Sequence, residues 1–313
     1  MLRLIGNRLL YSLPLLFVVS TFSYVLQSLV HGDLARTILG IRGTPEQYQS
    51  LRKSLGLDEA TPVRYWHWLQ GALHGDLGQS LFTQQSVAGL LNARLPVTLS
   101  LVVGATLASA VIGVALGVAS ALRPGSVDTL VGGLGLVGLA TPDFFLGLAL
   151  VTWLAVDHHL FPATGYVSPQ ASVGQWLQSI ALPVTVLVVG AVAVIARQTR
   201  ESMRDVLERP FIKTLRAAGV RNRSVIFKHA LRNAAIPVVT VLGLTFVGIL
   251  SGTVVVESVF AIPGLGGTAV QATEQHDTPL VQGVVLYFTV IIVLVNLLID
   301  LLYGWLDPRV RVS

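Results

Sequence analysis

Long apolar runs dominate the pattern of hydrophobic and polar positions along the chain. A helix needs about 20 apolar residues to cross the roughly 30 Å hydrocarbon core of a bilayer. Six runs approach or exceed that length: Leu9–Val30, Leu95–Ala121, Thr129–Val156, Ile180–Ala196, Ile236–Val256 and Leu280–Leu306. Polar and charged residues gather between these runs. The pattern therefore predicts an all-α, polytopic membrane protein with six transmembrane helices.

Composition strengthens this interpretation and excludes several classes of protein. Of the 313 residues, 53% are hydrophobic and only 12% are charged, about half the charged share of a soluble domain. A soluble enzyme of this size would lack polar residues for its surface. The chain has no cysteine, which excludes a disulfide scaffold, a cysteine metal site and a thiol nucleophile.

The distribution of Lys and Arg predicts how the chain is oriented. The N-terminus, the turn at Arg123, residues 197–235 and the C-terminal tail together hold 15 of the 21 basic residues. The other six all lie in residues 31–94. Because cytoplasmic loops are enriched in Lys and Arg, we expect both termini and segment 197–235 to be cytoplasmic. This describes a multi-pass membrane protein with both termini in the cytoplasm.

The spacing of the apolar runs divides the chain into three parts. Residues 1–30 form the cytoplasmic N-terminus and the first transmembrane helix. Residues 31–94 form an external segment, too long for a plain loop, with helix-like stretches at Pro45–Leu55 and Val63–Leu73. Residues 95–313 form a core of five transmembrane helices, which includes a cytoplasmic loop at about 197–235.

The third apolar run is interrupted by Thr141, Pro142 and Asp143. Proline breaks or kinks a helix, so Thr141 is expected to cap a second half-helix with Pro142 at its first position. Asp143 would then lie in the positive first turn. A carboxylate within a span is costly and often functional. Two interpretations stay open: Asp143 completes a local cap, or it faces an aqueous pathway and attracts a cationic group.

The basic segment contains a short helix that could bind a partner. Pro210 suits the first helical position, Phe211, Ile212 and Leu215 share an apolar face, and Gly219 suits the position that ends the helix. Such a helix, placed between charged arms, could dock in a groove on a cytoplasmic protein. The alternative is a basic amphipathic helix that lies on anionic lipid headgroups.

Four motifs in this order resemble those of the permeases of ABC importers, in particular the dipeptide, oligopeptide and nickel branch. The first begins at His74 and reads His-Gly-Asp-Leu-Gly-Gln-Ser, and the second joins Lys213-Thr214-Leu215 and Gly219 to His229–Pro237. The third is Pro263-Gly264-Leu265-Gly266, and the last covers Asn296–Tyr303 with Leu306–Arg309. The resemblance covers nearly the whole chain.

This resemblance implies a subunit that depends on partners for its energy. In the family, the short cytoplasmic helix contacts an ATPase subunit; here the matching positions are Phe211, Ile212, Thr214, Leu215 and Gly219. The implied assembly includes a second homologous permease, two cytoplasmic P-loop ATPase subunits or domains, and an external peptide-binding protein. ATP and Mg would bind the ATPases, with no cofactor on this chain. A phosphate-binding loop needs Gly-Lys-[Ser/Thr], and none of the three lysines follows a glycine.

Acidic residues near the outer end of the fifth run suggest a second pathway element. Glu257, Glu274 and Asp277 would make an acidic mouth that favours cationic groups, although ordinary solvated loop charge explains them equally well. The pathway candidates are therefore Asp143 and Glu257. The pair His158-His159 has one close further donor, Asp157, so no metal site is assigned.

The sequence thus predicts a non-catalytic permease subunit of an ATP-driven importer for di- or oligopeptides, embedded in the lipid bilayer and without a nucleic-acid partner. One alternative is the same machinery for nickel or a glutathione-like solute. The other is a stand-alone secondary transporter, which would need coupling charges within the membrane and an internal repeat.

Overall fold

The computed structural model describes residues 2–29, 39, 44–54, 58–123 and 125–306. The last motif extends past the described residues after Leu306. Residue 30 of the first predicted span and residues 31–38, 40–43 and 55–57 of the predicted external segment also lie outside them. The α-helices are α1 (Leu2–Leu29), α3 (Pro45–Ser54), α4 (Thr61–Leu73), α5 (Val87–Leu122), α6 (Ser126–Ala140), α7 (Asp143–Leu150), α8 (Val173–Leu207), α9 (Pro210–Ala217), α10 (Asn222–Ser224), α11 (Leu231–Val259), α12 (Leu265–Glu274) and α13 (Thr278–Leu306). Two π-helical segments, η2 (Val151–Asp157) and η3 (Val225–Ala230), continue α7 and precede α11.

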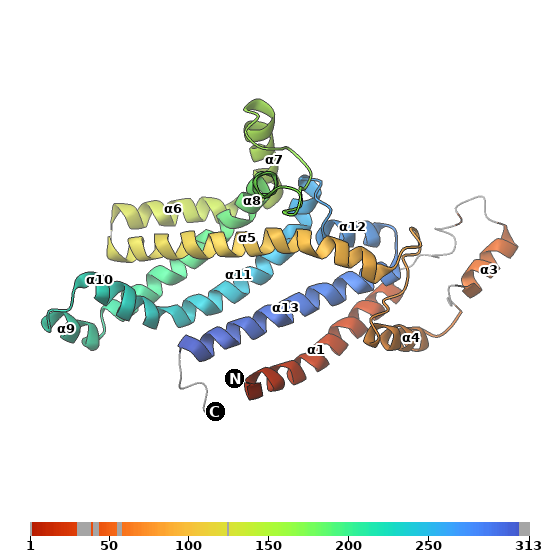
Figure 1. The fold of residues 1–313 in the computed structure, drawn as a ribbon, viewed down its shortest axis with the longest axis horizontal. Coiled ribbons are helices and arrows are strands. Elements are labelled where there is room, and N and C mark those ends of the chain that lie inside the picture. Colours follow the sequence, from red (N-terminus) through yellow and green to blue (C-terminus); the bar gives the residue numbers. More distant parts are fainter. Residues whose placement is uncertain (1, 30–38, 40–43, 55–57, 124, 307–313) are drawn as a thin grey trace. The chain divides into compact units, whose positions relative to one another are not determined.

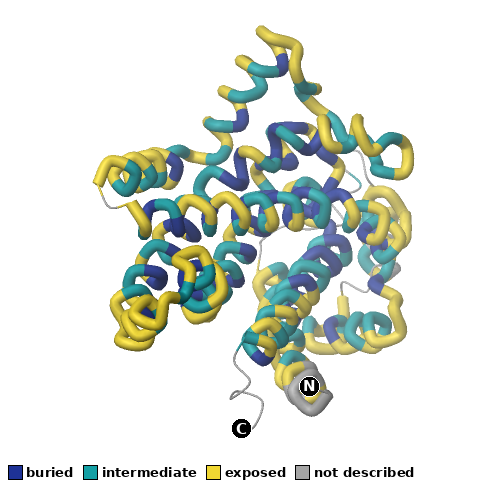
Figure 2. Tube along the Cα trace, turned by 60° about the vertical axis from the view of Figure 1, so that its left-hand side comes forward, coloured by how far each residue is buried: buried dark blue, intermediate teal, exposed yellow. Residues whose placement is uncertain are grey.

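The all-α class and the six spans are confirmed, with one difference in geometry. Five helical stretches in the described residues are long and apolar enough to cross a membrane. The third predicted span is instead a pair, Ser126–Ala140 and Asp143–Asp157, bent by 99° at the break and counted as the sixth span only if the two are taken together. Most long helices carry exposed residues along part of their surface (Figure 2), as expected for helices that face lipid or other subunits.

The chain divides into two compact units that differ from the predicted three-part division. One comprises Val97–Gly266 and the chain from Leu294, and the other comprises Leu2–Pro96 and Gly267–Val293. These units follow packing, whereas the predicted division follows the order of spans, so the latter stays a prediction. The two predicted helices of the external segment are present, as α3 and α4.

In the first unit, α8 is the central helix and packs against α6 and α11. Small residues allow close approach. A Cβ added at Gly113 of α5 would lie 2.8 Å from Ile195 of α8, and one added at Gly117 would lie 2.5 Å from the Ala196 carbonyl oxygen. Gly113 and Gly117 thus allow α5 to lie directly against α8, as small residues do in other membrane helix pairs. Helices α9 and α10 lie at the end of this unit where α8 ends (Figure 1).

In the second unit, buried polar contacts fix α1 against α4 and the beginning of α13. The Tyr65 hydroxyl of α4 lies 2.8 Å from Ser20 Oγ and accepts a hydrogen bond from Thr21 Oγ1 at 2.9 Å. The amide of Gln282 donates to the Ser20 carbonyl oxygen at 2.8 Å. A polar group in an apolar environment is costly without a partner, so these bonds define how the helices align.

Candidate functional site

The short helix of the basic segment forms as its sequence predicts. Proline at the first position of α9 has no N–H to satisfy and a favourable φ. The helix ends at Ala217, and Gly219 adopts a φ of +72°. The Val220 N–H donates to the Leu215 carbonyl oxygen at 3.1 Å, and the Gly219 N–H donates to that of Arg216 at 3.0 Å. These bonds satisfy terminal carbonyls and turn the chain toward α10.

The structure divides the apolar face that the sequence assigned to docking. Ile212 is 0% exposed within an apolar cluster, and Leu215 packs against the same cluster. Phe211 is 37% exposed, and Thr214 and Gly219 are exposed. Two of the three apolar side chains of the predicted face thus pack within this chain, and the contact with a partner stays a prediction. Burial of one such side chain stabilises by about 1.5–3 kcal/mol, which favours this orientation of α9.

The residues that cover Ile212 and Leu215 were missed by sequence reasoning. They lie on α5, on the end of α8, and on η3 and α11. The buried members besides Ile212 are Val118, Met203, Val206, Val225, Ile226, Ala230 and Ala234. Positions 226, 230 and 234 recur every four residues, a helical spacing that could have indicated a second apolar face opposite that of α9.

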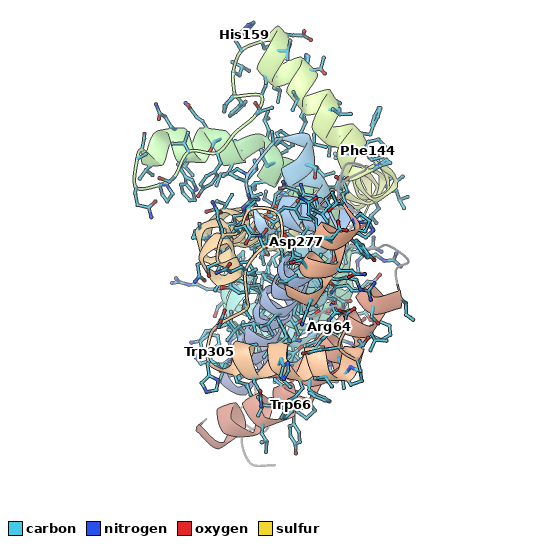
Figure 3. All side chains as sticks on the ribbon, turned by 90° about the vertical axis from the view of Figure 1, so that its right-hand side faces the viewer. Arg64, Trp66, Phe144, His159, Asp277 and Trp305 are labelled. Carbon is cyan, nitrogen blue, oxygen red and sulfur yellow. The ribbon has the colours of Figure 1, made fainter. Side chains whose placement is uncertain are left out.

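The break in the third span differs by one residue from its predicted form. Thr141 Oγ1 donates to the Val137 carbonyl oxygen at 2.7 Å, so Thr141 belongs to the end of α6. Pro142 then occupies the N-cap position, and Asp143 is the first residue of α7. Phe144 and His159 mark the two ends of the arm formed by α7 and η2 (Figure 3).

Asp143 is half-buried beside α11. A Cβ added at Gly252 of α11 would lie 3.2 Å from Asp143 Oδ2, so glycine leaves room for the carboxylate. The residue lies at the N-terminus of α7, where exposed backbone N–H groups favour a negative charge. The predicted placement in the first turn of a half-helix is confirmed.

Glu257, the second pathway candidate, is enclosed. It is 1% exposed, and its Oε1 accepts a hydrogen bond from Thr98 Oγ1 at 2.6 Å. Thr98 Oγ1 in turn accepts from the Leu265 N–H at 2.8 Å. Glycine at positions 264 and 266 makes space for the carboxylate, which a Cβ at either position would meet. Glu257 thus lies in an enclosed polar contact in this structure, and its place in a pathway stays a prediction.

The other two acidic residues of the predicted mouth, Asp277 and Glu274, differ from each other in burial. Asp277 is 0% exposed and accepts hydrogen bonds from Ser80 Oγ at 2.6 Å and from the Leu81 N–H at 3.2 Å. This joins the motif that begins at His74 to the connection before α13 in one polar contact. Glu274 is exposed. Among the described residues, no group of three or more His, Asp or Glu could hold a metal ion.

The described residues are mostly helical, with apolar spans, a sharply broken span and a short helix at the end of a basic segment, a combination typical of a polytopic transport permease. Comparison with known proteins names the family. The chain belongs to the family described as the inner membrane component of binding-protein-dependent transport systems, which matches residues 87–312, and the corresponding N-terminal family matches residues 1–102. It is accordingly a permease subunit of an ABC transporter.

Relatives resemble the chain over its whole length. A protein of Brucella abortus, provisionally named a peptide transport system permease, is 39% identical over 99% of both chains. The glutathione transport system permease protein of Pectobacterium atrosepticum is 38% identical, again over 99% of both. The dipeptide transport system permease protein of Escherichia coli K12 is 36% identical over 99% of both.

A solved structure confirms the fold. The inward-facing methionine ABC transporter MetNI contains a chain that matches with a TM-score of 0.54 and 20% identity. The match covers 70% of this chain and 96% of that one. At this identity the likeness shows the permease fold alone.

Proposed function

We propose that this chain forms half of the translocation pathway of an ATP-driven importer for short peptides. The observation that carries the proposal is the full-length similarity, at 36–39% identity, to permeases named for peptide, dipeptide and glutathione transport. These solutes share a short backbone with a free amine, a carboxylate and at least one amide bond. A glutathione-like solute thus falls within the same chemical class.

The partners of the proposed assembly follow from the family. A second permease would complete the pathway, an external peptide-binding protein would deliver the solute, and two cytoplasmic ATPases would bind ATP and Mg. This chain itself would catalyse no reaction. The excess of basic residues in segment 197–235 supports a cytoplasmic location for α9 and for both termini, in the bacterial inner membrane.

The solvent-exposed face of α9 is the proposed contact with the ATPases. Phe211, Thr214 and Gly219 are exposed there, while Ile212 and Leu215 hold the helix on its own subunit. The five predicted coupling residues therefore have two different proposed roles. The exposed three would meet the partner, and the inward two would transmit the displacement of α9 to the cluster behind it.

Asp143 is the proposed pathway residue. It is half-buried within a predicted span, at a break where the backbone turns by 99°. Intramembrane carboxylates commonly face a cavity or a pathway because a lipid-facing charge is costly. Its charge would attract the amino group of a peptide during passage. Glu257 is assigned instead to holding the Pro263–Gly266 loop.

Uptake by cells tests the solute class. Cells that lack this chain should lose most uptake of a labelled dipeptide and should recover it when the chain is restored. Labelled nickel and a free amino acid are the comparison solutes, and their uptake should be unchanged. Unaltered dipeptide uptake combined with lost nickel uptake would transfer the assignment to the nickel alternative.

A further inference from the structure

A three-helix polar cluster lies close to α9 but involves none of the predicted coupling residues. Asp128, in the first turn of α6, accepts a hydrogen bond from Ser120 Oγ of α5 at 2.6 Å. It also accepts from Arg200 Nη1 at 2.6 Å and from Arg204 Nη2 at 2.9 Å, both on α8. One carboxylate thus joins α5, α6 and α8. We name Ser120, Asp128, Arg200 and Arg204 the Asp128 clamp.

The clamp is partly enclosed, so its ion pairs are less screened than surface pairs. The side-chain exposures are 19% for Asp128 and 31% and 35% for the two arginines. Arg200 and Arg204 are one helical turn apart, and like charges at that spacing repel. Asp128 neutralises this repulsion while it joins the helices. Glu201, a carboxylate of α8, is engaged by Arg197 of the same helix at 3.1 Å.

The end of α8 that carries the clamp also contacts α9. Met203 and Val206 lie in the apolar cluster that buries Ile212 of α9 and Val118 of α5. No proline follows Pro183 in α8, so the helix continues unbroken from the clamp to Leu207. We call this end of α8, residues 200–207, the α8 arm. One side of it contacts α9, and another side is bound to α6 through Asp128.

Close packing extends this connection along α6 toward the broken span. A Cβ added at Gly135 of α6 would lie 3.2 Å from Ala193 Cβ of α8, and one added at Gly138 would lie 2.9 Å from Val189 Cγ1. Both helices are in direct contact up to the residues that precede Thr141. A displacement of the α8 arm would thus reach the break next to Asp143 if α6 stays attached.

We infer that Asp128 is a positioning residue that makes α5, α6 and the α8 arm move as one body with α9. The clamp transfers the ATP-driven displacement of the coupling helix to the broken span. The inference rests on the proposed function, because it assumes that α9 receives that displacement. It assigns a role in energy coupling to residues that lie outside the predicted contact with the ATPases.

The test uses the complete transporter in proteoliposomes, with ATP hydrolysis and dipeptide uptake measured on the same vesicles. Asp128→Asn should leave complex assembly and hydrolysis largely intact while uptake per ATP falls about ten-fold, within the range of measured coupling energies. The matched control is Arg197→Gln, which removes an ion pair within α8 alone and should leave the ratio unchanged. Arg197 is 78% exposed.

A reversible cross-link provides a readout that a merely structural role would not change. The chain has no cysteine, so Gly135→Cys with Ala193→Cys introduces a single pair. Its two Cβ atoms would lie 3.2 Å apart, somewhat less than the average of about 3.8 Å in disulfides. Oxidation of the pair with copper phenanthroline in the Asp128→Asn background should restore uptake per ATP, and dithiothreitol should abolish the rescue.

Two results would overturn the inference while leaving the proposed function intact: an unchanged ratio in Asp128→Asn, or no rescue by a cross-link shown to have formed. Parallel loss of assembly and hydrolysis in Asp128→Asn would also overturn it, because the residue would then only stabilise the fold. Failure of the proposed function is distinguishable, since the unsubstituted transporter would then show no ATP-dependent dipeptide uptake.

Discussion

At the residue scale, the two carboxylates predicted to line the pathway have different surroundings. Asp143 is half-buried at a helix N-terminus beside the space left by Gly252. Glu257 is buried on Thr98, 159 positions earlier in the chain. Both are acidic residues in apolar runs, so the sequence could not separate them. The difference arises from tertiary contacts of high sequence separation, which no local pattern encodes.

Asp143→Asn should weaken uptake of peptides with a free amine more than uptake of N-acetylated peptides. A partly exposed ion pair is worth about 1 kcal/mol, which corresponds to about a five-fold change. The measurement is the initial uptake rate of matched free and acetylated dipeptides in vesicles. Asp157→Asn, at the exposed last residue of η2, is the control. Equal losses for both peptides would assign Asp143 a structural role.

Substitutions at or near Glu257 should reduce the stability of the protein and should not primarily change which solute it transports. Glu257→Ala removes the acceptor of Thr98, and a hydrogen bond to a charged group is worth about 1.5–3 kcal/mol. Gly264→Ala places a methyl group against the carboxylate, and overpacking costs about 1–3 kcal/mol. Both should lower the Tm of the detergent-solubilised protein, with Gly174→Ala at an open position as control. An unchanged Tm for both would refute the assigned role of this loop.

At the element scale, the start and end signals of α9 were readable from the sequence. Pro210 and Gly219 bracket the helix in both the prediction and the structure. The sequence does not show which side of α9 is exposed, because this depends on the apolar cluster that α8, η3 and α11 supply. The same holds for the third span: Pro142 predicts a break, but it does not predict the 99° bend between the two helices.

Substitutions on the exposed face of α9 can distinguish a loss of ATPase docking from a loss of folding stability. Phe211→Ala and Thr214→Arg should preserve membrane insertion and Tm but reduce ATP-coupled uptake, because both change exposed side chains. Ile212→Ala should instead destabilise the protein by about 2–5 kcal/mol, since it empties a buried position. Insertion, Tm and uptake are measured for each variant.

Thr273→Arg is the matched control for this face. Thr273 is exposed on α12 and, like Thr214, donates from Oγ1 to the carbonyl oxygen four residues earlier. It should leave uptake unchanged. Normal uptake by both α9 variants would remove α9 from the coupling pathway and favour the alternative of a helix on lipid headgroups.

At the scale of the whole molecule, the number of spans was predictable from hydrophobic length, whereas the permease fold was predictable from the resemblance of four motifs to a known family. The two compact units were not, because Gly267–Val293 groups with the N-terminal part of the chain only after folding. Small residues such as Gly113 and Gly117 permit close helix packing, but only the structure identifies α8 as their partner helix.

The most direct test of the account is ATP-driven uptake by the purified assembly. The tagged chain is solubilised in mild detergent, the co-purifying proteins are identified by mass spectrometry, and the assembly is placed in vesicles with its external binding protein. We expect a second permease and P-loop ATPases to co-purify, and dipeptide uptake to require hydrolysable ATP. A chain that purifies alone and transports without ATP would contradict the account and identify a self-sufficient transporter.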